Sequence, residues 1–155
     1  MQVNQSQIVR IIADHGRKLE RLETLPAGSG GTGGVHATVG YIFNKGAGLL
    51  TTDMVGEIRA FFTGTIIRWS VVSSPSGGTV RFNVKKSTYA GYPTMADIDG
   101  TDPPQLAAAQ KAESTTLTGW VTSIVTGDIL RFEVDPAVAV LLTTRAVLTL
   151  ECSIP

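Results

Sequence analysis

The clearest strand in this 155-residue chain is the stretch Thr79-Val80-Arg81-Phe82-Asn83-Val84-Lys85. Its apolar residues alternate with polar ones, and successive side chains of a strand point to opposite faces. One face of this strand is therefore apolar and the other polar, which is the pattern of a half-buried strand. The stretch predicts that the chain folds around a sheet with one face on the core.

Segments of the same kind recur about every ten residues, with turn-forming residues between them. Further strands are predicted at residues 35–43, 57–62, 65–72, 119–125, 129–135 and 145–152. A tight turn at Thr63-Gly64 is expected to join two of them, and Ala146, Leu148 and Leu150 are expected to share one face of the last. Short strands joined by hairpins and one long excursion are typical of a mainly β protein, an antiparallel β-sandwich or jelly roll.

The long excursion spans residues 86–117 and contains one segment of high helix propensity. Residues 105–113 follow a proline and include three consecutive alanines, so a short helix is predicted there. Trp69 and Trp120 lie in apolar strands and are expected to fill the core or a subunit interface. Cys152 is the only cysteine, which excludes an intrachain disulfide and favours a small buried side chain.

A different periodicity precedes the β region. Residues there recur with spacings of four, three, four and three, which is the seam of a coiled coil. The seam residues are Ile8, Ile12, His15, Leu19 and Leu22. Lys18 then falls at heptad position g and Glu23 at position e, so a salt bridge between neighbouring helices is available in a parallel assembly.

The same stripe also fits a single amphipathic helix that packs on its own domain. His15 at position d would fix the register of the helices, make assembly pH-sensitive or bind a metal on the axis. The seam is short and contains Gly16, so self-association through it alone is expected to be weak. The downstream domain, or another protein, is expected to share the interface.

A glycine-rich run follows Pro26 and separates the two patterns. Such a composition is typical of a flexible tether. We therefore predict an oligomerisation or anchor helix at residues 1–25, a glycine-rich linker at residues 26–34 and a β-sandwich domain at residues 35–155.

Composition narrows the classes of partner. Thirteen Lys and Arg residues balance thirteen Asp and Glu residues, so no basic excess favours nucleic acid or an anionic membrane. The polar amino terminus does not match a signal peptide, and no apolar stretch approaches the length that spans a bilayer. The protein is expected to be made in a cytoplasm and to act in solution or in a particle.

Motifs for catalysis are missing from the sequence. A serine-hydrolase elbow is not present, the glycine run lacks the lysine of a phosphate-binding loop, and the carboxylates are dispersed. No enzyme activity and no cofactor are expected. Asp97, Asp99 and Asp102 surround a glycine turn and are weak calcium candidates, with a solvated acidic turn as the alternative.

Two tyrosines of the long excursion are the candidate binding residues. Tyr89 and Tyr92 lie beside Gly91 and Pro93, shortly after Lys85. Exposed aromatic rings on a structured loop suit a surface that binds a sugar or a protein. The alternative is that the tyrosines hold the loop against the sandwich. His36 follows the linker and is interpreted as an exposed residue at the start of a strand.

Several phrases of the β region resemble the small fibre, spike and tail-associated β domains of tailed bacteriophages. One is Leu117-Thr118-Gly119-Trp120, and the others lie at residues 64–69, 84–89, 92–94, 110–112 and 127–135. The heptad segment resembles the amino termini of phage tail-fibre and head-fibre proteins, which are typically parallel trimers. The resemblance covers about two thirds of the chain.

This resemblance implies a virion structural protein, a homotrimeric fibre or spike on the tail or head of the particle. Its partners would be other copies of the chain and further tail, collar or capsid proteins, with a host surface glycan or protein as a further partner. Two alternatives are a capsid decoration protein and a glycan-binding module for receptor recognition. The resemblance implies no catalytic residues.

Overall fold

The computed structural model describes residues 7–14, 17–24, 34–74, 78–140 and 142–155. This part of the chain contains strands and no helix, and so no helix that could cross a membrane. The strands are β1 (Gln7–Asp14), β2 (Arg17–Thr24), β3 (Val35–Asn44), β4 (Val55–Arg59), β5 (Gly64–Ser74), β6 (Val80–Ser87), β7 (Ala96–Asp97), β8 (Gln105–Leu106), β9 (Lys111–Ser114), β10 (Ser123–Ile124), β11 (Ile129–Val134) and β12 (Arg145–Ile154). The mainly β fold predicted from the sequence is confirmed.

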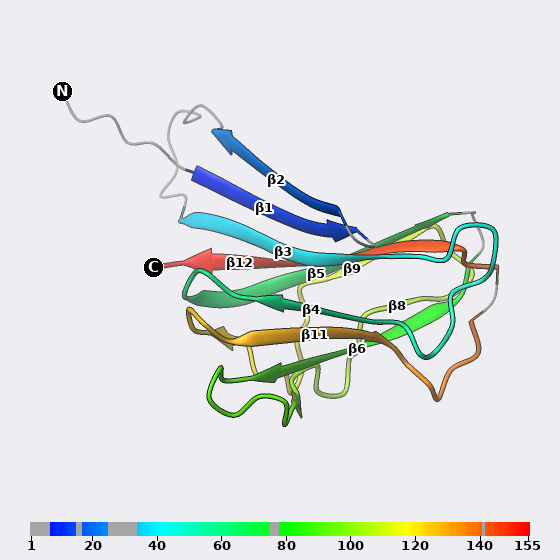
Figure 1. The fold of residues 1–155 in the computed structure, drawn as a ribbon. Helices are drawn as coiled ribbons and strands as arrows, with labels where there is room; N and C mark the ends of the chain where they lie inside the picture. The colour runs from blue at the N-terminus through cyan, green and yellow to red at the C-terminus, as the bar shows by residue number, and fades with distance from the viewer. Residues whose placement is uncertain (1–6, 15–16, 25–33, 75–77, 141) are drawn as a thin grey trace.

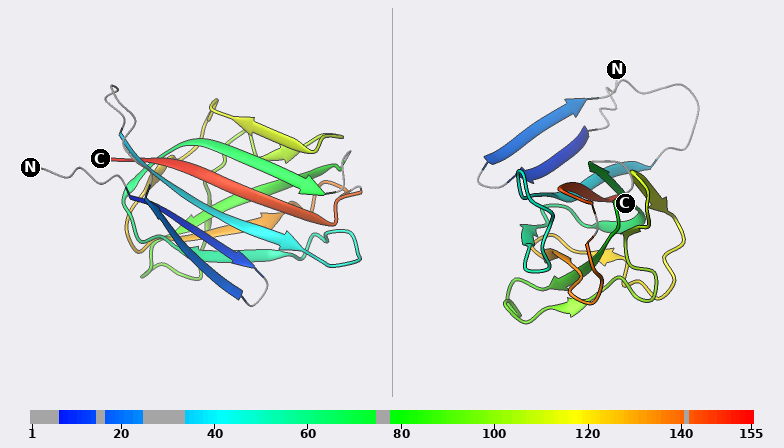
Figure 2. Two further views of the ribbon diagram at one scale, coloured as in Figure 1. Left: turned by 90° about the horizontal axis from the view of Figure 1, so that it is seen from above. Right: turned by 90° about the vertical axis from the view of Figure 1, so that its right-hand side faces the viewer.

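The strands form two sheets that stack as layers (Figure 1, Figure 2). The first sheet has the order β10-β5-β12-β3-β1-β2, with β9 also paired to β5. The second has the order β4-β11-β6-β7, with β8 also paired to β6. Neighbouring strands are antiparallel except for β1 and β3, which are parallel. The predicted antiparallel sheets are therefore confirmed from residue 35 onward.

The strand pairings are nested along the chain. β3 pairs with β12, β4 with β11, β5 with β9 and β10, and β6 with β7. The prediction that Thr63-Gly64 closes a hairpin is wrong, because β4 and β5 belong to different sheets. Turn residues indicate where a chain reverses, but they do not specify which sheet receives the next strand.

The core lies between the inner faces of the two sheets. Val80, Phe82 and Val84 of β6 are fully buried, as their alternation in the sequence predicts. The Phe82 ring packs on the Phe43 ring of β3 with centroids 4.9 Å apart, which joins one sheet to the other. Apolar burial of this kind is the main favourable term in folding.

Other predicted core positions agree with the structure. Ala146, Leu148 and Leu150 of β12 point into the core. Trp69 and Trp120 are 4% and 8% exposed and belong to the core of this chain, which settles the choice between core and interface within one copy.

The helix predicted at residues 105–113 is wrong. The short strands β8 and β9 occupy this region, and Ala108 between them has a φ of 51°, outside the right-handed helical range. β9 pairs with β5 and Ala112 packs against the core. Burial and pairing with a long strand outweigh the helix propensity of the alanines, which is a weak preference. The strand predicted at residues 119–125 is reduced to β10.

The amino-terminal segment also differs from its prediction. Residues 7–24 form the antiparallel pair β1 and β2, which extends the first sheet past β3 (Figure 1). Ile8 and Ile12 lie in β1, and Lys18, Leu19, Leu22 and Glu23 lie in β2, so the coiled-coil helix is not confirmed. The run of β-branched residues in β1 favours a strand, and Gly16 disfavours a helix. His15 and most of the linker lie outside the described residues.

Hydrogen bonds tie together two connections at one end of the sandwich. The loop between β4 and β5 meets the turn before β11, where the Thr63 and Thr126 hydroxyls lie 3.2 Å apart. The amide of Gly127 donates to the Ala60 carbonyl over 2.7 Å, and the Ala60 amide donates to the Asp128 carbonyl over 2.7 Å. These bonds fix the end of β4, which carries part of the candidate site.

Gly56 of β4 provides a test of the packing between the sheets. A Cβ atom at Gly56 would overlap the ring of Tyr41, whereas one at Gly48 would meet Lys45 only at 3.7 Å. We expect Gly56→Ala to lower the free energy of unfolding by about 1–3 kcal/mol through overpacking. Gly48→Ala is the matched control and should change it by less than about 1 kcal/mol. Urea unfolding measures both, and equal effects would contradict the packing described here.

Candidate binding site

The loop that carries the two predicted binding residues is a compact turn. The amides of Gly91 and Tyr92 both donate to the carbonyl of Thr88 over 3.1 Å, and the Gly91 amide also lies 3.1 Å from the Thr88 hydroxyl. The peptide bond between Tyr92 and Pro93 is cis. The local hydrogen bonds hold the backbone, so the two tyrosine rings project from a structured loop rather than from an extended one.

The two tyrosines line a shallow pocket on the outer face of the second sheet. Tyr89 is 66% exposed and Tyr92 is 45% exposed. The pocket has a volume of about 490 Å³. Its lining residues are Glu57, Ile58, Arg59, Tyr89, Tyr92 and Ile129. We call this the tyrosine pocket; its floor comes from β4 and β11, and its wall comes from the loop after β6.

Glu57 connects the wall of the tyrosine pocket to the sheet. The Tyr92 hydroxyl donates to Glu57 Oε2 over 2.8 Å, and Arg131 Nε donates to Glu57 Oε1 over 2.7 Å. The hydrogen bond to Glu57 and its negative charge raise the pKa of Tyr92. The same carboxylate raises the pKa of Arg131. Glu57 therefore has both carboxylate oxygens engaged, and its charge is matched by that of Arg131.

Arg59 is placed differently from the other charged residues of this face. Its guanidinium carbon lies 4.6 Å from the centre of the Tyr89 ring, which is the geometry of a cation–π contact. In the register of the sheet, Arg59 lies opposite Ile129, and Ile129 lies opposite Ser87. No carboxylate therefore stands beside Arg59 in its cross-strand row. Within the described residues, Arg59 has no ion-pair partner.

The structure brings both predicted binding residues into one pocket but gives them different roles. Tyr92 is held to the sheet through Glu57, as the alternative interpretation of a pinned loop requires. Tyr89 remains largely exposed, with Arg59 against its ring. Sequence reasoning missed the three charged residues of the site, Glu57, Arg59 and Arg131. Alternation along the strands places them on an outer face. Glu57 is 35 residues from Tyr92 and 74 residues from Arg131, so no local sequence pattern indicates that they meet.

The three calcium candidates take part in separate contacts. Asp97 lies 3.7 Å from the Lys85 ammonium, and Asp99 is buried with its Oδ2 accepting from the Val84 amide over 2.9 Å. Burial raises the pKa of Asp99. The Asp102 carbonyl accepts a hydrogen bond from the Trp120 indole. No three acidic, histidine or cysteine side chains of the described residues gather as a metal site would require.

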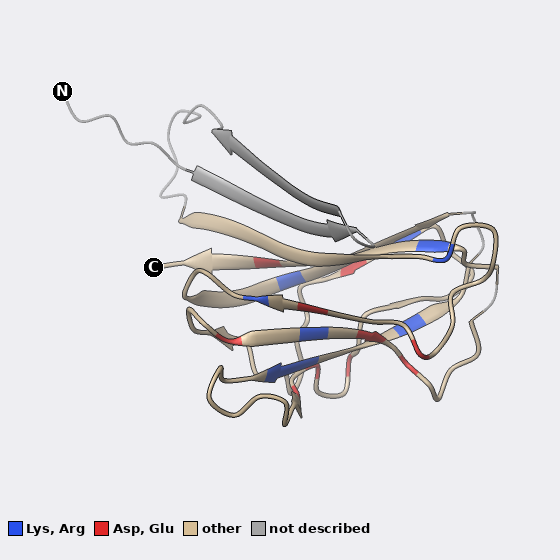
Figure 3. Cartoon of the chain, in the orientation of Figure 1, with Lys and Arg blue, Asp and Glu red and all other residues tan. Residues whose placement is uncertain are grey.

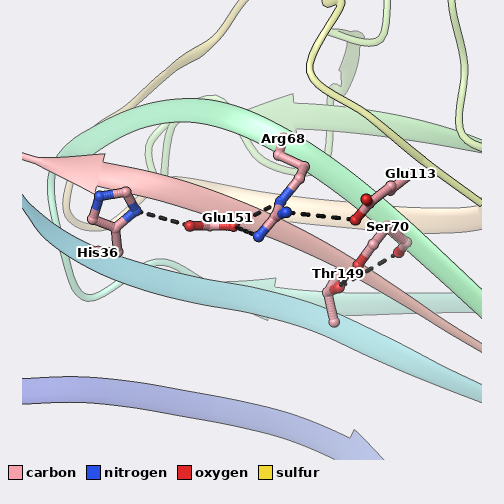
Figure 4. Close-up of polar contacts among 6 residues, drawn as sticks. All are labelled: His36, Arg68, Ser70, Glu113, Thr149 and Glu151. Atoms are coloured by element: carbon pink, nitrogen blue, oxygen red, sulfur yellow. Dashed lines mark hydrogen bonds and ion pairs between the residues drawn. The ribbon is translucent and has the colours of Figure 1, made fainter. Parts of the chain in front are cut away.

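A row of polar side chains crosses the outer face of the first sheet (Figure 4). His36 Nδ1 and Arg68 Nε each lie 2.8 Å from a Glu151 carboxylate oxygen, and Arg68 also lies 3.5 Å from Glu113. Partial burial acts to raise the pKa of Glu151, but the bonds from Arg68 and His36 outweigh it and lower the pKa. His36 is half-exposed at the start of β3, close to its prediction, and its Glu151 partner was not foreseen.

The single thiol offers little reactivity. Cys152 is fully buried in β12, as predicted from its apolar surroundings. Burial, together with the charge of Glu151, raises the pKa of Cys152 to about 12. The thiolate is the nucleophilic form, so a thiol with this pKa remains protonated and inert near neutral pH.

Comparison with protein-family models, curated proteins and solved structures finds no match to this chain.

Alkaline titration tests the Tyr92–Glu57 contact. In Glu57→Gln the negative charge beside the phenol is lost, so the phenolate forms more easily and the Tyr92 pKa should fall toward its ordinary value of 10.0. The rise of tyrosinate absorbance with pH measures this pKa, and Tyr92→Phe identifies which transition belongs to Tyr92. Circular dichroism over the same range confirms that the chain stays folded. An unchanged titration in Glu57→Gln would contradict the contact.

Proposed function

We propose that this chain is a structural protein of a tailed-bacteriophage particle, and that its β region is a jelly-roll domain displayed as part of a homotrimeric fibre or spike. The observation that carries the proposal is the nested pairing of the strands. A chain that folds back on itself near β6 and β7, and then divides its paired strands between two sheets, has the topology of a jelly roll. Jelly rolls recur in viral capsid proteins and in lectins.

The strand order supports this assignment in detail. From residue 35 onward, and leaving aside β8 and β10, the first sheet runs β3-β12-β5-β9 and the second runs β4-β11-β6-β7, in which β7 has two residues. Each of these strands pairs with the one at the mirrored position in the chain, counted from both ends of the β region. Because a shared fold does not fix a function, the phage-like phrases supply the link to a virion.

The charges of the surface support a displayed domain. Positive and negative side chains are interspersed over β4, β11 and β6 (Figure 3). Glu57 pairs with Arg131, and Lys85 lies 2.5 Å from Glu133. Charged residues are depleted at the cores of protein interfaces, so a face of this kind suits contact with solvent. A non-enzymatic role is part of the proposal.

Residues 1–25 are proposed to gather and anchor the three chains. The heptad seam spans only residues 8–22, and an isolated helix of about 15 residues or fewer is marginal in water, so a single chain lacks the partners that would stabilise it. Pairing along the edge of β3 is the arrangement that a single chain can offer residues 7–24. In the proposed trimer the same segment has two further copies to pack against through the heptad seam.

Native mass spectrometry of the full chain tests the oligomer. We expect a trimer, and we expect Leu19→Asp or deletion of residues 1–25 to shift the population toward monomer, because a charge at position a destabilises the seam. Leu49→Asp is the matched control, since Leu49 is 45% exposed and lies in the loop after β3. A monomer at all concentrations, or equal effects of the two leucine substitutions, would contradict the trimer.

Labelling of purified particles with an antibody against the β region tests the location. A tail or head fibre predicts labels at discrete tail, collar or vertex positions. Labels spread evenly over the capsid would instead favour the decoration protein, which is the structural alternative. Particles without label, from cells that produce the chain, would contradict both.

A glycan-binding module for receptor recognition is the second candidate. The tyrosine pocket favours it, because Tyr89 exposes most of its ring on a loop held by its own hydrogen bonds. Binding residues are often carried by loops that a rigid scaffold positions. Such a module could belong to the fibre itself, with the pocket facing the host.

A further inference from the structure

We propose that the tyrosine pocket binds an acidic saccharide, a sugar that carries a carboxylate, and that Arg59 is the residue that recognises the carboxylate. The proposal rests on the glycan-binding candidate above and names the class of sugar. Its central observation is that the guanidinium of Arg59 lies over an exposed tyrosine with no acidic partner among the described residues.

Three of the other four arginines from residue 34 onward have an acidic partner. Arg68 pairs with Glu151, Arg81 with Asp135 and Arg131 with Glu57. Among the arginines from residue 34 onward, only Arg59 and Arg145 lack an ion-pair partner in the described structure. Arg145 begins β12, whereas Arg59 ends β4 and lines the tyrosine pocket.

The charges of the pocket favour an anion. Glu57 and Arg131 match each other, which leaves Arg59 as the uncompensated charge of the lining. A guanidinium presents a planar set of donors that binds a carboxylate through two parallel hydrogen bonds. The Tyr89 ring restricts the guanidinium on one side, so less side-chain freedom is lost when an anion binds.

The shape and polarity of the pocket favour a sugar as the carrier of that carboxylate. The pocket is shallow, and the two tyrosines that line it are exposed. A pyranose ring has an apolar face that can stack on an aromatic plate and a rim of hydroxyls that seek polar partners. The Tyr92 hydroxyl donates its proton to Glu57, so its oxygen can accept a hydrogen bond from a sugar hydroxyl beside the ring. A peptide anchor would instead require a deeper apolar cavity for a buried side chain.

The two roles of the tyrosines fit this arrangement. Tyr92 is fixed through Glu57 and forms a rigid side of the pocket. Tyr89 remains largely exposed, because Arg59 contacts the ring without burying it. The saccharide would contact the exposed part of Tyr89 and place its carboxylate at the Arg59 guanidinium.

Titration calorimetry on the full chain, with two matched pairs of probes, tests the proposal. Oligogalacturonate and sialyllactose are the acidic probes. Methyl-esterified oligogalacturonate and the methyl ester of sialyllactose are their uncharged partners. We expect each acidic probe to bind at least about tenfold more tightly than its partner, which is the effect of one strong charged hydrogen-bond pair. The preference should decrease as ionic strength rises.

Substitutions in the pocket test which residues cause the preference for acidic probes over uncharged ones. Arg59→Gln should reduce the affinity for oligogalacturonate about tenfold or more and leave the weaker binding of the methyl ester unchanged. Tyr89→Ala should lower the affinity for both probes, because it removes the aromatic ring that contacts the sugar. Arg145→Gln is the matched control and should bind like the wild-type chain, since it removes an unpaired arginine outside the pocket. Circular dichroism of each variant confirms folding.

The outcomes separate this proposal from the function that it deepens. Equal binding of acidic and neutral probes, lost in Tyr89→Ala and kept in Arg59→Gln, would overturn the carboxylate preference and leave glycan binding standing. Binding of no saccharide would overturn both. A polyglutamate peptide that binds as tightly as oligogalacturonate would also overturn the proposal, because the site would then recognise carboxylates without a sugar. The virion location is tested separately by particle labelling.

Discussion

The contact between the inner faces of the two sheets is the constraint on which the other features depend. Once Phe82 of β6 packs on Phe43 of β3, each long strand must present alternate residues to the core and to solvent. The charged residues of β4, β6 and β11 are then forced onto one outer face, where they pair across strands. Arg59 remains unpaired because its row continues through Ile129 and Ser87 rather than through an acid. The proposed binding chemistry is therefore a consequence of core packing and strand register.

Alternation predicted the long strands correctly because the same pattern that a sequence displays is the one that a buried sheet requires. The strands at residues 79–85, 129–135 and 145–152 lie close to the observed bounds of β6, β11 and β12. Residues 105–113 escaped prediction for a different reason. Their helix propensity is real, but β9 pairs with β5, and that partner is not near it in the sequence.

Only the two tyrosines of the candidate site were predicted, because the pairings between distant strands that complete the site leave no local pattern in the sequence. Tyr89 and Tyr92 stand out locally, as aromatic residues beside glycine and proline. Glu57 and Arg59 look like ordinary outward residues of a strand until the fold places the tyrosine loop over them. Local composition can therefore locate a binding loop, whereas its chemistry depends on what the opposite strands present.

The position of β12 has a consequence for how the protein is made. This strand lies between β3 and β5 at the centre of the first sheet, and its register joins Ser153 to His36 across more than a hundred residues. Neither neighbour can complete its pairing on that side until the ribosome has released the segment that fills the gap. Sheets dominated by such distant contacts form slowly, so a growing chain would expose two unpaired edges during synthesis. Protection of those edges during synthesis is therefore a requirement that the nested topology places on the cell that makes the protein.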